Sequence, residues 1–80
     1  MNLYIGNLSF KMTEEELKEI FEGFGEVNRV KIITDRETGR SRGFGFVEYK
    51  NKEDGEKATN ELNGKEIQGR SLIVNESRNK

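Results

Sequence analysis

The chain has 80 residues, of which 31% are hydrophobic and 36% charged, and its formal net charge at pH 7 is −1. This length suits one domain, and the apolar residues fall in patterned clusters, so we expect a globular fold. The absence of cysteine and histidine excludes disulfides and thiolate metal sites and removes the commonest general base. No apolar run is long enough to span a membrane and no secretory signal opens the chain, so we expect an intracellular, cytoplasmic protein.

The first predicted elements are a strand and a helix. Residues 3–8, Leu-Tyr-Ile-Gly-Asn-Leu, alternate in polarity as a strand does. Thr13 and Glu16 have the spacing of a capping box, in which each side chain binds the other residue's backbone N–H at a helix start. Apolar residues at 17, 20, 21 and 24 then form the stripe of an amphipathic helix, which ends at nearby glycines.

A hairpin, a second helix and a last strand follow. Strands are predicted at residues 27–34 and 42–49, with a polar turn between them. Asn51 is placed to cap a helix that ends at Asn63-Gly64. A short strand is predicted at 72–74.

The order β-α-β-β-α-β predicts an α+β, ferredoxin-like sandwich. Both helices would pack on one face of a four-stranded antiparallel sheet, and the other face would be open to solvent. We predict one domain at residues 1–76 and a flexible C-terminal tail at 77–80, with fraying from residue 76. The residues expected to face the helices are Leu3, Ile5, Val30, Ile32, Gly45, Val47, Tyr49, Leu72 and Val74.

Aromatic side chains are expected on the open sheet face. Phe44 and Phe46 are two residues apart, so they share a face of their strand with Arg42 and Glu48. The first and third strands are adjacent in this topology, which brings Tyr4 beside both rings. Three exposed rings need a reason: either they cover an oligomer interface or stabilise the sheet as cross-strand pairs, or they stack nucleobases. We favour stacking, because every base offers a π-face.

Charge is distributed unevenly along the chain. Glutamates concentrate on the predicted helices, whereas arginines and lysines concentrate on predicted strands, a loop and the C-terminal residues. The net charge alone argues against a nucleic-acid ligand. The distribution instead indicates an acidic body with one locally basic face.

Two segments carry a resemblance to a known family. Residues 42–49, Arg-Gly-Phe-Gly-Phe-Val-Glu-Tyr, resemble the RNP octamer of the RNA recognition motif and match its pattern at every position. Residues 3–8 resemble the hexamer that accompanies it. Their spacing and the Asn63-Gly64 turn also fit, so the resemblance covers nearly the whole chain. The chain is similar to small bacterial RNA-binding proteins that contain a single such motif.

The resemblance implies that single-stranded RNA lies on the open sheet face, with two or three bases stacked there. By this resemblance Tyr4 and Phe46 would stack bases, Phe44 would contact ribose, and Arg42 would pair with a phosphate. Asn7 would be a structural hydrogen-bonding residue. The residues expected to contact RNA are Tyr4, Lys31, Arg36, Arg40, Arg42, Phe44, Phe46, Ile73 and Asn75.

Some positions depart from the family's pattern. Gly55 and Thr59 stand where the family usually has apolar residues. A glycine inside a helix costs about 1 kcal/mol relative to alanine, so the second helix is expected to be weak, anchored only by Ala58 and Leu62. Ile73 makes the binding face more apolar than the resemblance implies.

Two functions stay open from the sequence: an RNA-binding module, and a protein–protein interaction domain that uses the same aromatic face. Single-stranded DNA also stays open as a ligand, because stacking does not distinguish sugars. Without histidine, cysteine or clustered carboxylates on the open face, we expect no enzyme, cofactor or metal site. The protein is expected to act as a monomer without membrane contact.

Overall fold

Helix α1 (Glu14–Glu22) begins where its capping box predicts. The Thr13 hydroxyl oxygen accepts a hydrogen bond from the Glu16 backbone N–H at 3.1 Å, and the Glu16 carboxylate accepts one from the Thr13 backbone N–H at 3.0 Å. The bond from the Thr13 backbone holds the pKa of Glu16 below its ordinary value. Leu17 and Phe21 are buried and Ile20 is partly buried, as predicted, but Phe24 lies beyond the end of the helix and packs against the core from there.

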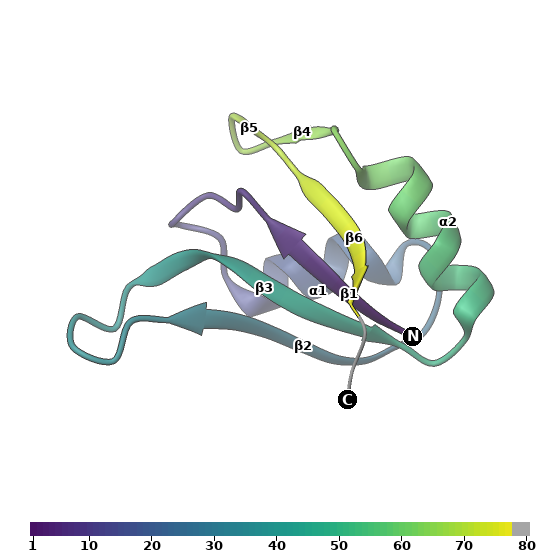
Figure 1. Cartoon of the computed structure of the whole chain (residues 1–80), viewed down its shortest axis with the longest axis horizontal. Coiled ribbons are helices and arrows are strands. Elements are labelled where there is room, and N and C mark those ends of the chain that lie inside the picture. The colour runs from purple at the N-terminus through teal and green to yellow at the C-terminus, as the bar shows by residue number, and fades with distance from the viewer. Residues whose placement is uncertain (78–80) are drawn as a thin grey trace.

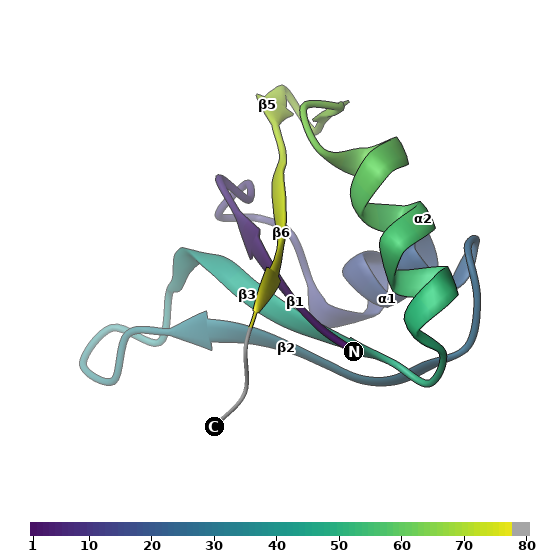
Figure 2. The ribbon, with the colours of Figure 1, turned by 45° about the vertical axis from the view of Figure 1, so that its right-hand side comes forward.

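The computed structural model describes residues 1–77, and four antiparallel strands there form one sheet in the order β2-β3-β1-β6. Helices α1 and α2 (Lys52–Leu62) lie on the same side of this sheet (Figure 1, Figure 2), so the predicted ferredoxin-like sandwich is confirmed. The central position of β1 and β3 is also as predicted. The strands of the sheet are β1 (Asn2–Gly6), β2 (Val27–Thr34), β3 (Ser41–Tyr49) and β6 (Ile73–Ser77).

Residues from both layers pack into one hydrophobic core. All the residues predicted to face the helices are buried, apart from Val30, which is partly buried. The Tyr49 hydroxyl donates a hydrogen bond to the Phe21 backbone carbonyl and so links β3 to α1. Burial, assisted by the negative charge of Asp54, raises the pKa of Tyr49 above its ordinary range.

Helix α2 differs from its prediction at both Asn51 and Gly55. Asn51 occupies the N-cap position, but its side chain does not cap the helix. Its amide instead donates to the Asp54 carboxylate at 3.4 Å, so the predicted side-chain cap is wrong. Gly55 is buried together with Ala58 and Leu62, and a Cβ there would collide with the Met1 sulfur. The glycine therefore provides a third packing position. Neither α1 nor α2 is long and apolar enough to cross a membrane, and residues 1–77 contain no other α-helix.

A short hairpin, which the sequence did not predict, precedes the last strand. β4 (Glu66–Ile67) and β5 (Arg70–Ser71) pair in antiparallel fashion. The two residues of the turn, Gln68 and Gly69, have φ angles of 53° and 80°. A turn with two positive φ angles suits the twist of a two-residue hairpin, although glutamine is an unusual first residue.

The last strand is longer than predicted. β6 starts at Ile73 and includes Ser77, so the prediction of a strand at 72–74 was displaced and too short. Fraying does not begin at residue 76, because Glu76 and Ser77 pair with β1. Residues 78–80 of the predicted tail lie outside the described residues.

Candidate nucleic-acid interface

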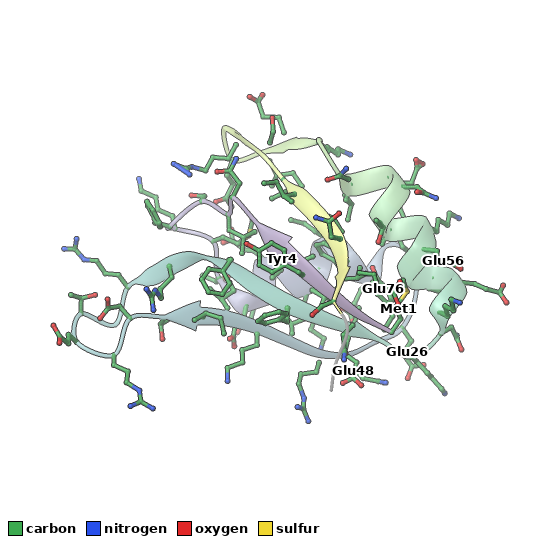
Figure 3. The ribbon with its side chains drawn as sticks, viewed as in Figure 1. Met1, Tyr4, Glu26, Glu48, Glu56 and Glu76 are labelled. Atoms are coloured by element: carbon green, nitrogen blue, oxygen red, sulfur yellow. The ribbon has the colours of Figure 1, made fainter. Side chains whose placement is uncertain are left out.

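Three aromatic rings meet on the sheet face opposite the helices. Tyr4 on β1 lies directly opposite Phe46 on β3, and Phe44 is two residues away on the same strand. The ring centroid of Tyr4 is 6.0 Å from the centroid of Phe44 and 6.0 Å from that of Phe46, and the two phenylalanine centroids are 6.4 Å apart. Figure 3 shows Tyr4 on the strand face that is turned to the viewer, with α1 behind the sheet. We call Tyr4, Phe44 and Phe46 the aromatic platform.

Two glycines near the platform residues make close approaches, one on each face of the sheet. A Cβ on Gly6 would come within 2.9 Å of the Tyr4 ring, so the ring would have to shift if this residue carried a side chain. A Cβ on Gly45, which lies between the two phenylalanines but faces the helices, would collide with the Lys31 carbonyl oxygen, so this glycine lets β2 and β3 lie close together. Phe46 is 36% exposed, whereas Tyr4 and Phe44 are partly buried by their neighbours. The neighbouring residues therefore bury part of each of these two rings, while the Phe46 ring stays accessible to solvent.

Arg42 was predicted to share the open face with Phe44 and Phe46 because strand residues alternate between faces. In the structure, β3 is irregular between Arg42 and Phe44. The β2–β3 register shifts between Ile32 and Thr34, and Gly43 has a φ angle of +83°. Strand alternation therefore places Phe44, Phe46 and Glu48 on one face but does not extend to Arg42. The Arg42 side chain is exposed, and its phosphate contact stays a prediction.

Three other predicted residues do lie beside the platform. Lys31 is opposite Phe46 on β2, and Asn75 is opposite Tyr4 on β6. Ile73 lies opposite Gly6 and is 46% exposed. All three side chains share the open face, because directly paired residues point to the same side of a sheet.

Arg36 and Arg40 lie apart from the platform, on the loop that projects beyond β2 and β3 (Figure 1). Both are exposed. The Asp35 carboxylate organises this loop by accepting hydrogen bonds from the backbone N–H groups of Glu37 at 2.7 Å and Thr38 at 3.3 Å. These two arginines therefore lie beyond the strand ends, and their contact with RNA stays a prediction.

Sequence reasoning missed a further aromatic residue. Phe10 follows β1 and is 63% exposed, with the Arg70 guanidinium carbon 5.3 Å from its ring centroid. Arg70 also donates to the Asn7 side-chain oxygen at 3.1 Å, and the Asn7 amide donates to the Ser71 carbonyl at 2.8 Å. Asn7 thus has the structural role that was expected. No periodic pattern marks Phe10, because it lies in a loop and its partner is 60 residues away.

Acidic residues gather away from the platform, with one exception. Glu15, Glu19 and Glu22 lie along α1, in the helical layer. Figure 3 places Glu26, Glu48, Glu56 and Glu76 around Met1, at one end of the sheet. Of these, Glu48 is the exception, because its strand register puts it on the open face beside Arg29. Within residues 1–77, no group of acidic side chains is arranged to hold a metal ion.

Comparison with known proteins establishes the family of the chain. The family model of the RNA recognition motif matches residues 3–73. The chain belongs to the RNA recognition motif family. The predicted resemblance is therefore confirmed over almost the full length of the molecule.

Individual members of the RNA recognition motif family are similar in sequence and in structure. The protein RbpD of Nostoc sp. is 50% identical over 78 residues, covering 98% of this chain and 83% of RbpD. The crystal structure of RNA binding protein PG1 has a TM-score of 0.97 and 49% identity, covering 100% of this chain and 96% of that one. The structure of the Rna15 RNA recognition motif with bound RNA (GU) has a TM-score of 0.88 and 32% identity. The match covers 98% of this chain and 83% of that one.

Proposed function

We propose that this chain binds single-stranded RNA on its aromatic platform. Tyr4 and Phe46 stack bases, Phe44 contacts ribose, and Arg42 pairs with a phosphate. Membership of the RNA recognition motif family supports this function, and so does the similarity to a motif whose structure contains bound RNA. The observation that carries the proposal is the group of three rings, with centroids 6.0 to 6.4 Å apart, on a sheet face that neither α1 nor α2 covers.

The neighbouring residues would complete the binding surface. Lys31 and the loop arginines Arg36 and Arg40 supply positive charge for phosphates, and Ile73 and Asn75 flank the platform on the β6 side. We propose that the predicted domain at residues 1–76, extended to Ser77 by the pairing of β6, is the binding domain and that it acts in the cytoplasm as a monomer. Single-stranded DNA is a second ligand that the same rings could stack.

The size of the stacking contribution suggests a moderate affinity. Stacking on an aromatic side chain contributes about 1–3 kcal/mol per base. Part of this is offset by the entropy lost when flexible RNA and side chains become ordered. A dissociation constant in the micromolar range, near −8 kcal/mol, is therefore expected.

Replacing one platform ring tests the proposal. We expect Phe46→Ala to weaken binding of a short fluorescent single-stranded RNA by at least about tenfold in an anisotropy titration, because one stacking contact is lost. Phe46 is 36% exposed, so the fold should be retained, which circular dichroism and thermal melting would show.

Phe10→Ala is the matched control, because it removes an exposed phenylalanine outside the platform. It should weaken binding much less than Phe46→Ala. Unchanged binding by a folded Phe46→Ala variant, or an equal loss in both variants, would contradict stacking on the platform. Dimerisation through the platform without RNA binding would instead support the protein–protein interaction function.

A further inference from the structure

A pocket borders the platform at the end of the sheet where the N-terminus lies. Its volume is about 320 Å³, and it opens beside the Phe46 ring. The pocket is large enough for the edge of a nucleobase whose face lies on that ring. Its principal lining side chains are those of Asn2, Arg29, Lys31, Phe46, Glu48 and Ser77.

The strand register explains why these side chains meet. Arg29, Glu48, Asn2 and Ser77 are successive cross-strand partners from β2 to β6, so they form one row across the open face. Phe46 belongs to the next row, together with Lys31 and Tyr4. A base on Phe46 would therefore have the Glu48 row along one of its edges.

Glu48 is chemically unusual for a surface that binds a polyanion. Its side chain is partly buried in the pocket, and an ionised carboxylate can only accept hydrogen bonds. Near phosphates it opposes binding unless the ligand presents donors to it. Arg29 and Lys31 in the same pocket can only donate. The pocket thus combines an acceptor with two donors next to a stacking ring.

We propose that this pocket selects guanine for the base that stacks on Phe46, an inference that rests on the proposed RNA-binding function. The guanine N1–H and N2–H groups are adjacent donors and match the two oxygens of the Glu48 carboxylate. The adjoining O6 acceptor is then placed for Lys31 or Arg29. Paired hydrogen bonds to a charged group are stronger and more directional than single neutral ones.

The other three bases fit this arrangement less well. Adenine presents one amino donor beside the N1 acceptor, and cytosine presents one amino donor beside N3. Uracil has a single N–H between two carbonyl oxygens. Each of them would turn at least one acceptor toward the carboxylate, whose oxygens have no proton to donate.

Base substitution combined with two charge-matched variants tests this selection. RNAs of about five nucleotides, with guanine, adenine, cytosine or uracil in the centre of a uracil background, are titrated against each protein. Glu76→Gln is the control for Glu48→Gln. It removes the same charge at the same end of the sheet, but Glu76 is paired with the core residue Leu3 and so lies on the helix side.

For the unmodified protein we expect about tenfold tighter binding of the guanine RNA than of the other three. Glu48→Gln should weaken guanine binding by about the same factor and leave the other RNAs unchanged or slightly tighter. Replacing guanine by inosine, which lacks the N2 amine, should reproduce much of this loss. Glu76→Gln should keep the guanine preference.

Equal binding of all four RNAs by the unmodified protein would overturn the selection while leaving RNA binding itself intact. The same conclusion follows if Glu48→Gln changes all four affinities alike, as a simple charge effect would. If none of the RNAs binds, both the selection and the proposed function fail.

Discussion

At the scale of single residues, a buried hydroxyl group connects the sheet to α1. The phenol of Tyr49 lies in the core, with its ring centroid 6.3 Å from that of Phe21. It donates to the Phe21 carbonyl, which lies in the last turn of the helix. The same carbonyl accepts a hydrogen bond from the Phe24 backbone N–H at 3.1 Å, so the phenol supplies a second donor to it. The bond also gives the buried phenol hydroxyl its acceptor, and a buried hydroxyl without one would be costly.

We expect Tyr49→Phe to lower the free energy of unfolding at pH 7 by about 1 kcal/mol, because one buried hydrogen bond between β3 and α1 is lost. Urea denaturation followed by circular dichroism measures this change. Tyr4→Phe is the control, since it makes the same substitution on the solvent-facing platform and should change stability by less than about 0.5 kcal/mol. Equal effects of the two substitutions would show that the Tyr49 hydroxyl has no special role.

The same phenol makes stability depend on alkaline pH. Its pKa is raised in the folded state, so folding favours the protonated form. The resulting stabilisation is fully present below about pH 10, the ordinary tyrosine pKa, and is lost as the pH rises toward the folded pKa. Between pH 9 and about pH 11, the unmodified protein should therefore lose more stability than Tyr49→Phe. Identical losses would contradict a raised pKa.

Residue-level patterns predicted the platform but not everything around it. Alternation on one strand and adjacency of two strands were sufficient for Tyr4, Phe44 and Phe46. The cation–π pair of Phe10 and Arg70 could not be predicted, because it joins a loop residue to the short strand β5, which is 60 residues away in the sequence. The pocket at Glu48 likewise depends on the register of four strands, and an eight-residue motif does not contain that information.

At the scale of elements, side chains from the helical layer protect the two edges of the sheet. β2 and β6 are the edge strands, and their outward N–H groups lack strand partners. The Glu14 carboxylate accepts from the Ile32 N–H at 2.9 Å, and the Asn63 side-chain oxygen accepts from the Val74 N–H at 3.0 Å. Each contact also fixes the end of a helix against the sheet.

We expect Asn63→Ala to lower the free energy of unfolding by about 1 kcal/mol, because the partly buried Val74 N–H would lose its acceptor. Asn63→Asp keeps an oxygen at the same position and should restore most of that stability. Urea denaturation of both variants measures the difference. Equal losses for alanine and aspartate would contradict a role for this hydrogen bond.

The strongly periodic elements were predictable, and the departures from periodicity were not. A capping box followed by an apolar stripe indicates a helix, as in α1. Alternation of apolar and other residues indicates a strand, as in β1 and β3. The β4–β5 hairpin has strands of two residues, which are too short to show alternation. The left-handed backbone at Gly43 interrupts β3 inside the octamer, so alternation does not decide the position of Arg42.

At the scale of the whole molecule, the two faces of the sandwich carry different chemistry. The helical layer carries most of the glutamates, and the open face carries the aromatic platform with Lys31 and Arg29 beside it. A net charge of −1 is therefore compatible with a polyanionic ligand, because the acidic groups are mostly turned away from it. This separation of the two faces also predicts that bound RNA changes the surroundings of residues on the open face and not those of α1.

Mapping the amide chemical shifts during titration with a short single-stranded RNA tests the central claim most directly. We expect the largest changes at Tyr4, Phe44 and Phe46, smaller ones at Ile73 and Asn75, and almost none along α1. Changes concentrated on the helices would contradict binding on the platform. The absence of any change at the three rings, with every RNA tested, would contradict RNA binding by this sheet face.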